Sequence, residues 1–256
     1  MLDLFQSVRL IVLSENADIV ITEMSNWIGI LDAVTIETTN GAIRSAGFNI
    51  NGAASFTTRT GEIVASGLSV SSLSLRSTNG RITATDISTS ASVNAGLVIE
   101  TENGAASLAR VRTTALHVNT AAARASIFLD DVNVSHDTRI HSGGSIHGQI
   151  AVERSAALSL NAEQAVLLEI DGAPRTVSAS TIVGPLRIAV SDPAFSGSFV
   201  ARSEVRRVHI IGGDLHFAQN NGETDNVWRG WRKNKNGAQR VSAYAQDGTV
   251  DLEFAF

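Results

Sequence analysis

Residues 73–82 read Leu-Ser-Leu-Arg-Ser-Thr-Asn-Gly-Arg-Ile, a strand-like phrase that ends in a tight turn. Variants of the phrase recur on both sides of it, with turn glycines at Gly41, Gly61, Gly80 and Gly104. These glycines advance by 20, 19 and 24 residues. A near-constant period of this size is typical of proteins that stack similar coils.

Each copy alternates apolar and polar residues, as in Leu73/Leu75 and Leu97/Ile99. A period of two turns one face of a strand inward and the other toward solvent. Asn-Gly tolerates positive φ, so the chain can turn sharply after each strand. Because successive copies lie about twenty residues apart, each turn belongs to a full coil rather than to a hairpin. We therefore predict an all-β, single-stranded parallel β-solenoid (β-helix) with coils of about 20 residues.

We expect residues 1–256 to form one solenoid domain. Residues 1–33 would supply an N-terminal strand or cap region, and residues 34–173 the regular coils. All three prolines fall after this point, and proline is excluded from central strand positions that donate a hydrogen bond. Residues 174–256 are therefore expected to form irregular coils and a C-terminal cap.

Two segments of this last part carry separate expectations. Residues 219–236 are polar and charged, which predicts a long loop. Residues 239–252 restore the strand–turn–strand phrase, and we expect them to be the last coil of the stack.

The composition excludes several classes of protein. A net charge of -5 argues against a sequence-independent nucleic-acid binder, whose surface would be basic. With no cysteine there is no disulfide framework, thiolate metal site or cysteine nucleophile. The first 14 residues are mildly apolar but are interrupted by Asp3, Gln6 and Arg9, so we predict neither a signal peptide nor a membrane span. The compartment and the oligomeric state stay open.

Three features resemble a known family. They are the Thr-Asn-Gly-x-Ile repeats, the segment Pro193-Ala-Phe-Ser-Gly-Ser-Phe199 and the closing segment Asp247-Gly-Thr-Val-Asp-Leu252. Together they are similar to adhesin-type β-solenoid domains of unknown function, especially the versions found in fungal proteins. The resemblance runs from about Ala17 to the C-terminus. It implies a parallel β-solenoid with an adhesive or scaffolding role, and it carries over no catalytic residue.

The candidate binding residues are Trp228, Arg229, Trp231 and Arg232, because tryptophan and arginine dominate interface hot spots. They could stack on sugar rings or on a protein surface. The favoured alternative is a cap, in which both indoles cover the end of the apolar core while the charges stay in solvent.

Asp130 and Asp131, followed by His147-Gly148, locally resemble pectin-cleaving hydrolases. Glycoside hydrolases use two carboxylates on either side of the scissile bond. However, the Asn-Thr-Asp and Arg-x-Lys strands of those enzymes are missing, and consecutive aspartates in a strand point to opposite faces. We predict no catalytic residue, and a polysaccharide-active β-helix enzyme remains the alternative.

His136 and His141 are the candidate metal ligands. Their spacing of five does not fit the helical pair of zinc sites, and on a strand it puts the two rings on opposite faces. We therefore predict no metal site, and no cofactor.

These observations predict a non-enzymatic adhesion or interaction scaffold. Its flat faces, rich in Ser, Thr and Asn, would bind an unknown protein or glycan surface, and a preorganised rod loses little conformational entropy on binding. A further possibility is an intracellular scaffold whose Trp228–Lys235 segment docks on a partner or an anionic surface.

Overall fold

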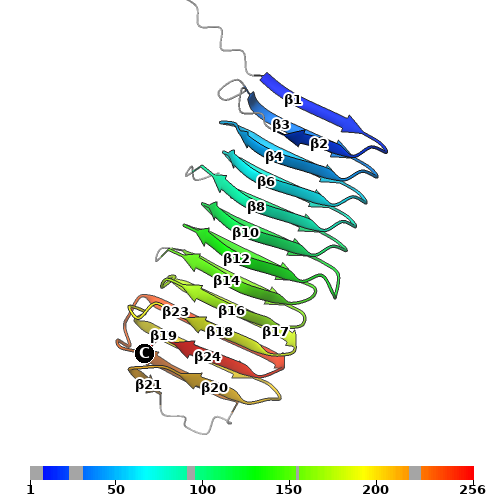
Figure 1. Ribbon diagram of the computed structural model, residues 1–256. Coiled ribbons are helices and arrows are strands. Elements are labelled where there is room, and N and C mark those ends of the chain that lie inside the picture. Colours follow the sequence, from blue (N-terminus) through cyan, green and yellow to red (C-terminus); the bar gives the residue numbers. More distant parts are fainter. Residues whose placement is uncertain (1–7, 23–30, 91–95, 154–155, 219–225) are drawn as a thin grey trace, which may run out of the picture.

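The computed structural model describes residues 8–22, 31–90, 96–153, 156–218 and 226–256, which form an elongated stack of coils (Figure 1). These described residues contain strands and turns but no helix, so the predicted all-β parallel solenoid is confirmed. The strands are β1 (Val8–Ser14), β2 (Ile19–Thr22), β3 (Leu31–Thr38), β4 (Ile43–Asn49), β5 (Ala53–Thr58), β6 (Ile63–Val70), β7 (Ser72–Ser77), β8 (Ile82–Thr89), β9 (Gly96–Thr101), β10 (Ala106–Thr113), β11 (Ala115–Thr120), β12 (Ile127–Val134), β13 (Asp137–Ser142), β14 (Ile146–Val152), β15 (Ala157–Ala162), β16 (Val166–Asp171), β17 (Thr176–Val183), β18 (Leu186–Val190), β19 (Gly197–Ser203), β20 (Val208–Ile211), β21 (Leu215–Phe217), β22 (Val227–Arg232), β23 (Gln239–Asp247) and β24 (Val250–Phe254).

Two sheets enclose the core. The first sheet has 13 strands in the order β1-β3-β5-β7-β9-β11-β13-β15-β17-β23-β19-β22-β21, and the second has 11 in the order β2-β4-β6-β8-β10-β12-β14-β16-β18-β24-β20. Neighbours pair in parallel, except where β22 pairs antiparallel with β19 and β21. Ile43, Ile63 and Ile82 occupy equivalent positions in successive coils, 20 and 19 residues apart, so the predicted coil length is also confirmed.

The core is a set of stacked apolar rows. In the first sheet, Ile36, Phe56, Leu75 and Ile99 lie in register, and each is fully buried. Burial of such a side chain stabilises the fold by roughly 1.5–3 kcal/mol, so these rows dominate stability.

Strands of the second sheet interrupt the simple alternation. In β6 the buried positions run Ile63, Ala65, Leu68, with a step of three at Gly67, whose φ is 62°. Equivalent left-handed residues occur at Gly47, Asp86, Arg110 and Asp131, where φ lies between 51° and 68°. These stacked left-handed residues bend each strand of the second sheet, and they shift the alternation of inward-facing and outward-facing residues by one position.

A ladder of hydroxyl groups joins the coils at the turn between the two sheets. Thr58 Oγ1 donates to the carbonyl oxygen of Gly41 in the preceding coil (2.9 Å) and accepts from the N–H of Gly61 in its own turn (3.1 Å). Ser77 and Thr101 repeat both bonds. Each hydroxyl therefore fixes its own turn and also the register of that turn on the coil before it.

Glycine is required in this hydroxyl ladder because the turns approach one another closely. A Cβ at Gly61, Gly80 or Gly104 would overlap the carbonyl oxygen of the turn glycine in the preceding coil. The Asn-Gly phrase of the sequence therefore marks a stacking contact as well as a turn.

The C-terminal coil stacks out of chain order. Residues 239–252 were expected to be the last coil, and this is wrong: β23 inserts between β17 and β19, and β24 between β18 and β20. In Figure 1, β24 accordingly lies between β18 and β20, above the end of the stack.

The inserted coil fits because its turn continues the hydroxyl ladder. A Cβ at Gly248 would overlap the carbonyl oxygen of Gly184 in the coil on one side. On the other side, Ser203 Oγ donates to the Gly248 carbonyl (2.7 Å) and accepts from the N–H of Arg206 (2.9 Å). The contacts match those of Thr58, so stacking follows turn geometry rather than chain order.

Replacing Thr101 by valine should test the hydroxyl ladder. Thr101→Val keeps the shape but removes the buried hydroxyl that pairs with Gly80 and Gly104, so we expect a loss of about 1–3 kcal/mol in unfolding free energy. Urea denaturation followed by circular dichroism would measure it. Thr83→Val, on the outward side of β8, is the control, and an equal loss in both variants would contradict the role of the ladder.

Candidate functional site

The outer face of the first sheet carries in-register rows of side chains, one per coil. One of them, here called the polar row, lies near the turns of the hydroxyl ladder. It consists of Glu37, Thr57, Arg76, Glu100, Asn119, His141, Asn161, Ser180, Tyr244 and Arg202. Because the coils are in register, these groups form a straight line along the rod.

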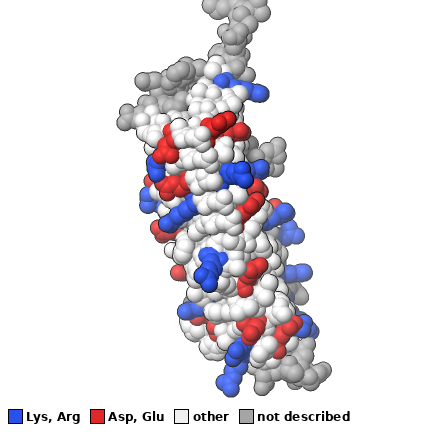
Figure 2. Space-filling view, turned by 90° about the vertical axis from the view of Figure 1, so that its right-hand side faces the viewer, with Lys and Arg blue, Asp and Glu red and all other residues white. Residues whose placement is uncertain are grey.

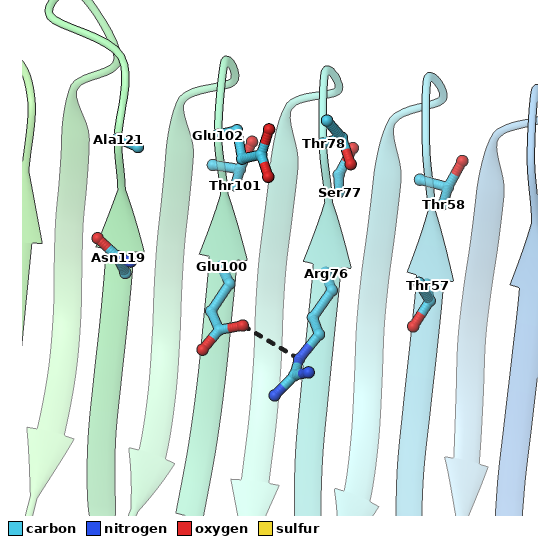
Figure 3. A pocket seen from close by; sticks show the side chains of 10 residues that line it. All are labelled: Thr57, Thr58, Arg76, Ser77, Thr78, Glu100, Thr101, Glu102, Asn119 and Ala121. Carbon is cyan, nitrogen blue, oxygen red and sulfur yellow. Dashed lines mark ion pairs between the residues drawn. The ribbon is translucent and has the colours of Figure 1, made fainter.

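Part of the polar row lines a shallow groove of about 400 Å³ (Figure 3). Figure 3 shows Arg76 and Glu100 on neighbouring strands, joined by an ion pair of 3.2 Å between Nε and Oε2. Asn119 borders the same groove, and its Oδ1 is buried without a hydrogen-bond partner among the described residues. The groove thus offers an ion pair whose remaining donors and acceptors suit hydroxyl or amide groups of a ligand, whereas the Asn119 Oδ1 is buried.

The far end of the polar row carries an aromatic group held by charges. Tyr244 Oη donates to Glu204 Oε1 (2.7 Å), and this hydrogen bond is the main reason that the pKa of Tyr244 is raised. Arg202 lies 5.8 Å from the centre of the Tyr244 ring and 3.7 Å from Glu204. The ring is therefore held by two charged neighbours, Arg202 and Glu204, on the β19 side of β23.

The tryptophan segment forms a strand, not the expected loop. Residues 227–232 are β22, which pairs antiparallel with β19, whereas 219–225 lie outside the described residues. The pairing puts Trp228 opposite the buried Ala201 and Trp231 opposite Ser198 on the outer side. Trp228 packs edge-on against Phe217 at 5.4 Å, so one indole, rather than both, covers the end of the core.

Arg232 is a buried structural residue. Its side chain is 1% exposed, and its guanidinium donates to the carbonyls of Gly213 (3.0 Å), Asp192 (3.4 Å) and Ala255 (2.5 Å). The expectation that the charges of this segment stay in solvent is therefore wrong for Arg232. No local pattern signals this burial, because the three partners lie 19 to 40 residues away along the chain.

Trp231 faces outward at the end of the first sheet. Its ring stacks on His216 with centroids 5.6 Å apart, and Lys235 Nζ lies 5.2 Å from the ring centre. Arg229 is exposed on the same side of β22. Two of the four predicted residues thus lie on the face that carries the polar row, and this outer face is the candidate site.

The second sheet carries the acidic pair and the histidine. Asp130 and Asp131 are both exposed, which contradicts the expectation of opposite faces, because Asp131 adopts the left-handed conformation. In the next coil, His147 stacks on the half-exposed ring of Phe128 at 5.7 Å, and burial lowers the pKa of His147.

Other chemistry of the described residues is limited. No three His, Cys, Asp or Glu side chains in the described ranges converge as metal ligands. The ring of His136 forms a side-chain hydrogen bond with the hydroxyl of Ser135 (3.2 Å).

No helix in the described part of the chain is long and apolar enough to cross a membrane. Positive and negative side chains are interspersed over the face shown in Figure 2.

Comparison with known proteins gives no family assignment: no protein-family model, curated protein or solved structure matches this chain. The structure has the β-solenoid fold that the adhesin-type resemblance implies, and this fold alone does not assign an adhesive role.

Replacing Arg232 should reveal its structural role. Arg232→Met leaves three carbonyls without their donor, so we expect a loss of at least about 2 kcal/mol in unfolding free energy. Chemical denaturation would measure it, with Arg139→Met, an exposed arginine of β13, as the control. A stability equal to that of the control variant would contradict the assignment.

Proposed function

We propose that the protein is a non-enzymatic adhesion or interaction scaffold that binds a glycan or protein surface along the outer face of the first sheet. The supporting observation is the polar row, which repeats one ligand-accessible side chain per coil over much of the rod. Single contacts of this kind are weak in water, but many contacts held in line by one preorganised scaffold add up.

Two parts of this face offer complementary chemistry. The groove near Arg76, Glu100 and Asn119 supplies hydrogen-bonding groups. Trp231 and Tyr244 supply aromatic rings whose positions are fixed by neighbouring side chains. Aromatic stacking combined with aligned polar groups suits sugar polymers, and it also suits an extended polypeptide.

Co-sedimentation with a panel of insoluble cell-wall polysaccharides tests the proposal. We expect retention on at least one polymer and a loss of about tenfold in apparent affinity for Trp231→Ala, because Trp231 faces outward and is removed without opening the core. Arg76→Ala/Glu100→Ala should also weaken retention.

Ile211→Ala is the control, since it removes an exposed apolar side chain from the second sheet. Equal loss in Ile211→Ala and Trp231→Ala would contradict the assignment of the binding face. Absence of retention on every polymer would argue against a glycan and would favour a protein partner or a purely structural scaffold.

A polysaccharide-active enzyme is the second candidate, favoured by the two exposed aspartates beside His147 and Phe128. A carboxylate pair and an aromatic ring are the groups that such an enzyme would use on a sugar. Release of reducing ends from a polymer, abolished in Asp130→Asn or Asp131→Asn with the fold intact, would favour this candidate over the scaffold.

A further inference from the structure

Asparagine followed by glycine marks many turns of this chain. Asparagine is thermolabile, and a glycine after it leaves the next backbone nitrogen open to the side-chain amide carbon. Attack of that nitrogen on Cγ closes a succinimide ring and expels ammonia, which carries away the proton of the nitrogen. Water then opens the ring to aspartate or isoaspartate. The described residues hold the pairs Asn40–Gly41, Asn51–Gly52, Asn79–Gly80, Asn103–Gly104 and Asn236–Gly237.

Three of these glycine nitrogens are held by the hydroxyl ladder, which Thr38 extends by one coil. The N–H of Gly41 donates to Thr38 Oγ1 (3.2 Å), that of Gly80 to Ser77 Oγ (2.8 Å) and that of Gly104 to Thr101 Oγ1 (3.0 Å). All three glycines are buried. Attack on the asparagine would break this bond, and a buried polar group that loses its partner costs free energy. The bond therefore holds the nitrogen away from the reaction.

The asparagine side chains of these turns are held as well. Asn103 Nδ2 donates to Asn79 Oδ1 (2.7 Å), and Asn40 Nδ2 donates to Asn16 Oδ1 (2.7 Å). Because the turns stack in register, each of these amides has a like amide beside it in the neighbouring coil. Both reacting groups of these pairs are thus fixed by the stack.

The turn between β4 and β5 lacks this protection. Asn51 is exposed, and neither its side chain nor the N–H of Gly52 has a hydrogen-bond partner among the described residues. The Gly52 carbonyl is held by the N–H of Ser71 (2.9 Å), but the carbonyl takes no part in the attack. At the remaining pair, the N–H of Gly237 donates to the Asn234 carbonyl (3.1 Å).

Close packing does not distinguish the five turns. A Cβ at any of the five glycines would overlap a backbone carbonyl oxygen of another turn or strand. The difference between them is the partner of the glycine nitrogen, which Gly52 alone of the five lacks among the described residues.

We propose that Asn51 is the site at which the folded chain deamidates, and that the hydroxyl ladder protects Asn40, Asn79 and Asn103 from the same reaction. The ladder then preserves the chemistry of its turns as well as their register. Deamidation at residue 51 replaces an amide by a carboxylate one residue from Gly52, which contacts the backbone of the exposed Asp32.

Peptide mapping by mass spectrometry tests the proposal on the full chain, kept folded in mildly alkaline buffer. A deamidated peptide is recognised by the mass change for loss of ammonia and gain of water. We expect Asn51 to react at least about tenfold faster than Asn79 or Asn103. In concentrated guanidinium the same peptides should react at similar rates, because no turn is then held. Asn221–Gly222 lies outside the described residues, and its peptide is scored separately.

A ladder variant tests the cause of the protection. Thr101→Val removes the hydroxyl that accepts the Gly104 N–H, so Asn103 should deamidate about tenfold faster. Asn40 in the same chain should keep its wild-type rate, which shows that the distant turns stay folded. Thr83→Val, on the outward side of β8, is the control and should leave the rate at Asn103 unchanged.

Three results would overturn the proposal. The first is a rate at Asn51 in the folded wild type that is no higher than the rates at Asn79 and Asn103. The second is a faster reaction at Asn236 than at Asn51. The third is an unchanged rate at Asn103 in Thr101→Val. If Thr101→Val also raises the rate at Asn40, the variant has unfolded, and the wild-type comparison decides.

Discussion

The bond on which this structure depends most is the contact between a turn hydroxyl and the glycine carbonyl of the neighbouring coil. Thr58, Ser77 and Thr101 each donate one such bond and accept another from their own turn. Apolar burial supplies most of the stabilisation, but burial is non-directional and would tolerate a coil slipped by two residues, which keeps the same face of the strand inward. The hydroxyl and the missing Cβ of glycine do not, because a slip would leave buried polar groups unpaired and bring atoms into overlap.

A fixed register has two consequences for the molecule. It aligns outward side chains into rows, so that a change at one strand position, such as Arg76 or Glu100, places a new group in line with all the others. A fixed register also allows a coil to occupy any position in the stack where its turn fits the turns of the two neighbouring coils. The coil of β23 and β24 arrives last in the chain, yet it occupies an internal position because Gly248 makes the same contacts as the other turn glycines. The interaction face proposed above is a product of this alignment.

The sequence predicts the repeating part of the fold well, because period, alternation and turn chemistry all lie within one coil. It does not predict the position of residues 239–252, since their phrase fits any slot in the stack and the choice depends on pairing across the chain. The left-handed conformation of Asp131 had a weak signal in the apolar step from Leu129 to Val132. For the site, the composition singles out the segment from Trp228 to Arg232, but it does not show which of these side chains face inward and which face outward. That division follows from the pairing of β22 with β19, and the partners of Arg232 are distant in sequence.

The most direct test of register-driven stacking is thiol cross-linking at three outward positions of the first sheet. Ser178 and Ser242 lie in register on adjacent strands, about 4.8 Å apart, and Val200 lies one strand further. Register-driven stacking predicts that a short cross-linker joins the two thiols of Ser178→Cys/Ser242→Cys but not those of Ser178→Cys/Val200→Cys. The reverse result would mean that the coils stack in chain order, and it would contradict the account.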